Sequence, residues 1–176
     1  PDACHGRGGT IALGPADRRE RSGNGGEPVS IQADIITALV ASLDAVTFTA
    51  TAATVLVESK NFPSYDIEDL ADPVICVTDG SIESERIARS SHMRDYAVEI
   101  YLARHTPEEA DCDVMLEMLE ELLGKLEDHY WPGITWPPGV TSPQTIVVEK
   151  NPGDALQERN VWRAGIVVTF KVPRSH

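Results

Sequence analysis

The sequence lacks several features that would place the chain in a well-defined class. It has no run of about 20 apolar residues, so no membrane-spanning helix is expected. Its three cysteines, Cys4, Cys76 and Cys112, form no Cys-x-x-Cys pair. This small odd number predicts neither a disulfide framework nor a zinc ribbon, and it fits a reducing compartment. The sequence begins without a basic-then-apolar leader, so we expect synthesis in the cytoplasm.

Recognisable catalytic, cofactor and metal motifs are also lacking. The glycine clusters at 6–9 and 23–26 do not lie between a strand and a helix, so they lack the helix N-terminus that binds phosphate. Asp111 and Asp113 resemble a metal-binding pair, but they fall in the first turns of a predicted helix, where the dipole favours acids. We therefore expect no catalytic residue, no cofactor and no metal. A small metal-binding enzyme that uses His92 with these two acids stays as an alternative.

Positive charge is scarce. The formal net charge is −13, and between residues 66 and 127 seventeen acidic residues face only five basic ones. Such a surface repels phosphate backbones, so tight nucleic-acid binding is not expected. Hydrophobic residues make up 41% of the chain and charged residues 24%, which is ordinary for a globular protein.

The composition divides the chain in two. Residues 1–29 hold seven of the thirteen glycines and few large apolar side chains. They cannot bury enough surface to offset their ordering entropy, so we expect a flexible N-terminal arm. Residues 30–176 have the length and composition of a single domain.

The hydrophobic spacing predicts two helices. Apolar residues at helical spacing follow Ser30, a possible N-cap, and predict a helix that ends near Asp44. Thr106 as N-cap, Pro107 in the first turn and Glu109 as the partner of a capping box predict the start of a second helix. Its expected buried stripe is Val114, Met115, Met118, Leu119, Leu122 and Leu126.

The remaining segments predict strands and connections. Asp79-Gly80 is expected to be a turn between two short strands, and residues 67–70 a helical turn. The clearest alternation places Tyr96, Val98, Ile100 and Leu102 on one face. The predicted strands are 46–57, 74–78, 81–89, 96–104, 144–150 and 161–172. The expected fold class is α+β, with a mostly antiparallel sheet of about 4–6 strands flanked by two helices.

The loop between the second helix and the last two strands contains prolines and tryptophans. Tyr130, Trp131 and Trp136 lie in it, and exposed tryptophan is enriched at protein interfaces. These three residues are the candidate assembly interface. Replacement of either tryptophan by alanine is then expected to leave the chain folded and to weaken assembly. The alternative is that the loop packs over the edge of the sheet.

Three segments in this order resemble tail terminator and neck proteins of long-tailed bacteriophages. They are Val46-Thr-Phe-Thr-Ala-Thr-Ala52, Tyr65-Asp-Ile-Glu-Asp-Leu-Ala-Asp-Pro-Val74 and Arg94-Asp-Tyr-Ala-Val-Glu-Ile-Tyr-Leu102, which precedes the acidic helix. The resemblance covers about residues 30–172 and rests on the order of elements rather than on an invariant motif. The glycine-rich arm and the Trp-Pro loop depart from it.

The resemblance implies a structural protein of the virion, made in the host cytoplasm and located at the head–tail junction. Such a subunit forms a ring, typically a hexamer, that caps the tail tube and joins it to the head connector. Its partners would be other copies of itself, the tail tube protein and the connector or adaptor proteins. DNA would pass through the lumen without specific binding, and no membrane is involved. There is no catalytic residue to carry over.

Two kinds of alternative remain open at this stage. A head-to-tail adaptor or head-closure protein would have the same lack of chemistry and a different neighbour. A peptide-binding adaptor would use one sheet edge for a single partner and would be a monomer.

Overall fold

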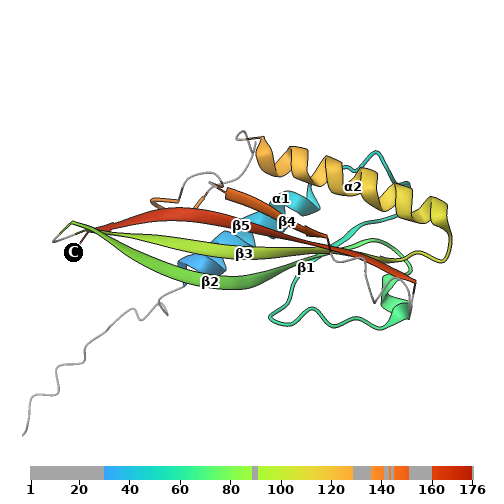
Figure 1. The fold of residues 1–176 in the computed structure, drawn as a ribbon, viewed down its shortest axis with the longest axis horizontal. Helices are drawn as coiled ribbons and strands as arrows, with labels where there is room; N and C mark the ends of the chain where they lie inside the picture. Colours follow the sequence, from blue (N-terminus) through green and yellow to red (C-terminus); the bar gives the residue numbers. More distant parts are fainter. Residues whose placement is uncertain are drawn as a thin grey trace, which may run out of the picture.

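The computed structural model describes residues 30–88, 91–128, 136–140, 143, 145–150 and 160–175 (Figure 1). The predicted N-terminal arm, residues 1–29, lies outside them. The elements in chain order are α1 Ile31–Asp44, β1 Leu56–Ser59, the 3-10 turn η1 Ile67–Leu70, β2 Val74–Ala88, β3 Ser91–His105, α2 Glu109–Glu127, β4 Thr145–Lys150 and β5 Val161–Ser175.

The strands form one five-stranded sheet in the order β1-β2-β3-β5-β4. β1 is parallel to β2, and all other neighbours are antiparallel. The central pair, β3 and β5, is in continuous register from Ser91 opposite Ser175 to His105 opposite Val161. The predicted α+β class, with a mostly antiparallel sheet and two helices, is confirmed.

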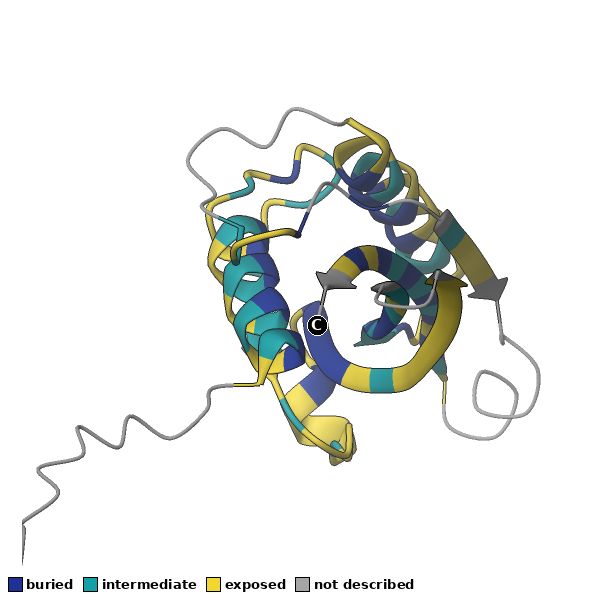
Figure 2. Ribbon diagram, turned by 90° about the vertical axis from the view of Figure 1, so that its left-hand side faces the viewer, coloured by how far each residue is buried: buried dark blue, intermediate teal, exposed yellow. Residues whose placement is uncertain are grey.

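Both helices cover the same face of the sheet, which we call the inner face. Figure 2 looks at the molecule from one end and shows them on one side of the curled strands. One hydrophobic cluster joins the helices to alternate strand residues. Its fully buried members include Ile35 and Leu39 of α1, Met118 of α2, Ile100 of β3 and Ile166 of β5. The alternation predicted for Tyr96, Val98, Ile100 and Leu102 is confirmed, because all four are buried.

The opposite, outer face is covered only in part. Val74 and Cys76 of β2 are buried there, and η1, which includes the buried Leu70, contacts the neighbouring strand β3. Farther along the sheet, Val147 of β4 is half-exposed and Lys171 of β5 is exposed on this face. The inner face therefore holds the main core, and the outer face holds a smaller cluster under residues 60–72.

A buried amide joins the first helix to the centre of the sheet. The side chain of Gln32 in α1 is only 7% exposed, and its Nε2 donates to the carbonyl oxygens of Gly80 at 3.1 Å and Ala97 at 3.0 Å. The register between β2 and β3 shifts at this point, between Asp79 and Ile82. A Cβ atom at Gly80 would lie 3.0 Å from the Ala97 carbonyl oxygen, so the close approach of the two strands requires glycine.

Beyond this bulge the sheet projects past the helices. Residues 81–88 of β2, 91–95 of β3 and 171–175 of β5 form the tip seen at the left of Figure 1, which we call the β-extension. Residues 81–87 are all exposed, and Ile82 and Ile87 are more than half exposed. Neither isoleucine belongs to the hydrophobic cluster of the inner face.

Two of the strand predictions are wrong. The turn predicted at Asp79-Gly80 and the separate strand 81–89 are instead one continuous strand, β2. Glycine here permits a bulge rather than a reversal, because Gln32 holds the backbone of both strands from above.

The strand predicted at 46–57 is reduced to Leu56–Ser59. Residues 46–55 instead cross between the helices. The backbone N–H of Thr49 donates to Glu121 of α2 at 2.8 Å, its hydroxyl donates to the same carboxylate, and Phe48 is buried. Burial between two helices outweighs the strand preference of the β-branched residues.

The helix boundaries are close to the predictions, but the caps differ. α1 begins after Ser30, as expected, yet the Ser30 side chain makes no cap hydrogen bond. α2 begins at Glu109, with Glu108 rather than Thr106 at the N-cap position. Thr106 extends the β3–β5 pairing instead, since its backbone N–H donates to the Asn160 carbonyl at 2.6 Å. Of the predicted α2 stripe, all but Val114 are buried. The predicted turn at 67–70 is confirmed.

Within the described residues, neither helix has the length and apolar character needed to cross a membrane.

Substitution Gln32→Leu is expected to lower the free energy of unfolding by about 2 kcal/mol, because it leaves two carbonyl oxygens of the bulge without their donor. Urea denaturation followed by circular dichroism measures the change. Asp34→Ala, at a partly exposed position on the same helix, is the control and should shift the midpoint far less. An unchanged midpoint for Gln32→Leu would show that the amide bridge does not stabilise the fold.

Candidate assembly surface

Three surfaces of the described chain are candidates for function: the two outer strands of the sheet, the β-extension, and a polar cluster beside β1. Tyr130 and Trp131 lie outside the described residues. Trp136 is partly buried against the main core, and its ring centroid lies 5.2 Å from that of Phe170 in β5. Trp136 thus packs against an interior strand rather than over an edge of the sheet, and the role of the three residues in assembly stays a prediction.

The segment around Trp136 covers the end of β5. Val140 is buried, and a Cβ at Gly139 would lie 3.8 Å from the Val172 side chain. Gly139 has a φ of +83°, a conformation in which glycine is favoured, so the chain can turn tightly over the strand. Val140 therefore belongs to the inner-face core, and Trp136 packs against it.

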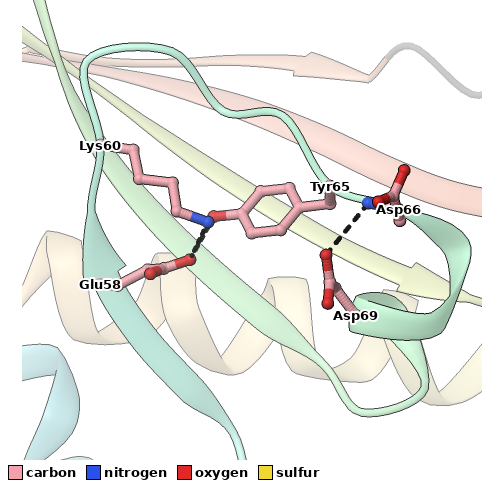
Figure 3. Close-up of polar contacts among 5 residues, drawn as sticks. All are labelled: Glu58, Lys60, Tyr65, Asp66 and Asp69. Carbon is pink, nitrogen blue, oxygen red and sulfur yellow. Dashed lines mark hydrogen bonds and ion pairs between the residues drawn. The ribbon is translucent and has the colours of Figure 1, made fainter.

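The polar cluster lies on the outer face, beside β1 (Figure 3). Lys60 Nζ lies 2.8 Å from Glu58 Oε1 and 4.0 Å from the centre of the Tyr65 ring. The Tyr65 hydroxyl donates to the same Glu58 oxygen at 2.8 Å. Three contacts thus tie the segment after β1 back onto the strand, and a fourth, from Asp66 N–H to the Asp69 carboxylate at 3.2 Å, closes the turn that follows.

The protonation states of Glu58 and Tyr65 fit a structural role, in which they hold the loop on β1, better than acid–base chemistry. The hydrogen bond from Lys60 lowers the pKa of Glu58 most strongly, with a further contribution from Tyr65, and partial burial opposes them. Burial, followed by the neighbouring Cys76 and Glu58, raises the pKa of the Tyr65 hydroxyl. At neutral pH the hydroxyl is protonated and acts as a donor, so it is a poor nucleophile or base.

The metal-binding alternative depends on His92, Asp111 and Asp113, which lie toward opposite ends of β3. His92 is near the start of the strand, and the two acids follow its end, roughly 40 Å away at 3.3 Å per residue. Asp111 contacts Arg104 at 3.6 Å. Among the residues that the structure describes, no group of three or more His, Cys, Asp or Glu side chains could hold a metal ion.

The exposed face of α2 is acidic. Glu109, Asp113, Glu117, Glu120 and Glu127 are all exposed, with Leu116 among them. Glu121 of the same helix is only partly exposed and binds Thr49, and that interaction lowers its pKa. The charge predicted from the sequence is therefore concentrated on one side of a helix whose other side is in the core.

The edge of β4 and the edge of β2 in the β-extension differ in regularity and in charge. β2 is the outer strand beyond residue 79, and there it carries two register shifts, at Asp79/Ile82 and at Arg86/Ala88, and the charges of Glu83, Glu85 and Arg86. Bulges and charges protect an edge from pairing. β4 has a continuous register, and its residues 145–148 are Thr-Ile-Val-Val. Val147 is 49% exposed and Val148 36%.

Sequence reasoning missed both the polar cluster and the β-extension. The cluster joins residues on either side of a proline-containing loop, and their spacing follows no periodic pattern. The β-extension was hidden because Asp79-Gly80 indicated a turn. The signal available was the strand pattern predicted on both sides of that dipeptide, at 74–78 and 81–89.

No protein-family model matches the chain, and no curated protein matches it in sequence.

Substitution Lys60→Met should make the unfolding free energy less dependent on pH in the acid range. Glu58 has a folded pKa below its ordinary value of 4.5, so its contribution is present above that value and is lost as pH falls through the folded pKa. The wild-type advantage over the variant should thus shrink below about pH 4.5. Urea titrations at a series of pH values measure it. Lys171→Met, which removes a lysine paired with Asp95 elsewhere in the sheet, is the charge-matched control. A constant difference at all pH values would contradict the assignment.

Substitution Trp136→Ala is expected to lower the free energy of unfolding by about 2 kcal/mol, because it removes ring contact with Phe170 and opens space in a packed core. Thermal or urea unfolding measures it. Phe62→Ala is a useful comparison, since Phe62 is 86% exposed and should change stability little. Equal effects of the two substitutions would show that Trp136 does not support the core.

Proposed function

We propose that this chain is a structural subunit of a bacteriophage virion, a tail terminator that assembles into a hexameric ring at the head–tail junction. The ring would cap the tail tube and join it to the head connector. The observation that supports this most directly is the β-extension, because β2 exposes two large apolar side chains there, Ile82 and Ile87. Large apolar side chains that their own fold leaves more than half exposed are well placed to contact another chain.

The remaining surface features fit the same role. The described residues include two outer strands with unpaired edges, which are templates for a neighbouring chain. The polar cluster beside β1 holds a loop rather than a substrate. The proposal also rests on the resemblance of residues 30–172 to tail terminator and neck proteins.

The acidic face of α2 gives the proposal a more specific form. If this face lines the ring, DNA would pass a surface of like charge and find no binding site. A basic lumen in the assembled ring would contradict this arrangement of the subunits without contradicting the ring.

The decisive measurement is where the protein lies in its source particle. Antibody-gold labelling with negative-stain imaging should place it at the junction of head and tail. Native mass spectrometry of the released protein should give about 115 kDa for six copies of 19.2 kDa. A label on the head side of the junction would favour the adaptor or head-closure role. A chain absent from every particle would overturn the virion role.

A further inference from the structure

We propose that copies of this chain join through their two outer strands, with the β1 edge of one copy paired antiparallel to the β4 edge of the next. The inference deepens the proposed ring and rests on it, since it states which surfaces close the assembly. The partner is a second copy of this chain. Four observations about the described strands support it.

The first observation is the direction of the strands. β1 and β2 run in one direction, β3 in the opposite one, β5 in the first again and β4 in the opposite one. A neighbour that continues the sheet in the same orientation therefore presents its β4 antiparallel to β1. This is the pairing that needs no change of fold in either copy.

The second observation is which backbone groups are free. The N–H groups of Leu56 and Lys60 donate to the carbonyl oxygens of Pro73 and Val77, so the even-numbered residues of this segment point their backbone groups toward β2. Val57 is odd-numbered, and its N–H and C=O therefore point away from β2. Thr106 and Asn160 form a hydrogen-bonded pair at the end of the β3–β5 ladder. The backbone N–H and C=O groups of even-numbered residues in β5 therefore point toward β3, and those of odd-numbered residues point toward β4. Ile146 and Val148 of β4, which lie opposite even residues of β5, then point outward. Val57 and Ile146 can exchange both hydrogen bonds.

The third observation is the match of side chains in that register. Val57 opposite Ile146 of the neighbour places two inner-face residues together, and both already pack at the margin of the core. The next pair is Leu56 with Val147, both on the outer face. Leu56 is 50% exposed and Val147 is 49% exposed. Each copy thus covers an apolar side chain that its own fold leaves half in water.

The fourth observation is that the protein protects the edge that this pairing does not use. The edge of β2 in the β-extension has two bulges and three charged side chains, whereas β4 has a regular register and four uncharged residues in sequence. A two-fold pairing of β4 with another β4 would also be antiparallel, but it would leave Leu56 of both copies exposed. The head-to-tail pairing uses both edges of every copy and is the one that can close a ring.

The test is a disulfide between Leu56→Cys and Val147→Cys in the full chain, with Cys4 and Cys112 replaced by serine and the buried Cys76 retained. Residues of an antiparallel non-hydrogen-bonded pair have Cα atoms about 4.5 Å apart, which lies within the disulfide range. Mild oxidation should give a ladder of linked chains on a non-reducing gel, ending at the ring size. Each single variant should stay unlinked. Leu56→Cys with Ile146→Cys places the thiols on opposite faces and should not link.

The outcomes separate this inference from the proposed function. Linked dimers from Val147→Cys alone would show the two-fold pairing and overturn the head-to-tail one. An assembled ring whose cysteine pair does not link would overturn the pairing while the virion role stands. A linked ring that is absent from every particle would leave the pairing and overturn the role. A chain that neither assembles nor links would overturn the pairing.

A second variant tests the interface without a covalent bond. Val147→Lys should weaken self-association at least about tenfold by placing a charge on the pairing edge, with the unfolding midpoint preserved because the side chain is half-exposed. Phe62→Lys, at an exposed apolar position outside the residues predicted to pair, is the matched control. Analytical ultracentrifugation measures both, and unchanged association for Val147→Lys would count against β4 as the interface.

Discussion

The amide of Gln32 is the constraint on which the shape of this protein depends. It donates to carbonyl oxygens of two neighbouring strands at the point where β2 bulges, and it comes from the helix that covers them. Gly80 allows the strands to approach closely there. Because the bulge is held on its inner side, β2 can continue for eight more residues instead of turning back. The β-extension is therefore a consequence of one buried side chain that satisfies the backbone where the core ends.

How much of this fold the sequence predicts depends on the range of the interactions involved. The helices, the alternation in β3 and the turn at 67–70 follow from local spacing, and the structure has them within a few residues. The failures involve partners far away in sequence. Residues 46–55 look like a strand until Glu121 binds Thr49, and Asp79-Gly80 looks like a turn until Gln32 binds Gly80. Thr106 looks like a helix cap until it pairs with Asn160. Local preference cannot include contacts that only the folded chain supplies.

The candidate surfaces follow the same rule. Tryptophans in a loop suggest an interface from composition alone, but Trp136 contacts Phe170 in the core. The pairing surfaces become visible only when strand order is known, since a strand is an edge by its position and not by its composition. Nothing in the sequence distinguishes Val147 and Leu56 from other apolar residues. The structure places them on the two outer strands of the sheet, each about half exposed, and this makes them candidates for an interface.

The β3–β5 pairing also determines when the chain can fold. Each residue of β5 lies opposite a residue of β3 made much earlier, with the hairpin strand β2, helix α2 and strand β4 already synthesised before β5 is complete. The β2–β3 hairpin is local, but the other edge of β3 has no partner until β5 is made. Such long-range pairing slows folding and leaves apolar strands open to water for longer. One edge of β3 therefore stays unpaired on the growing chain until residues 161–175 have been synthesised.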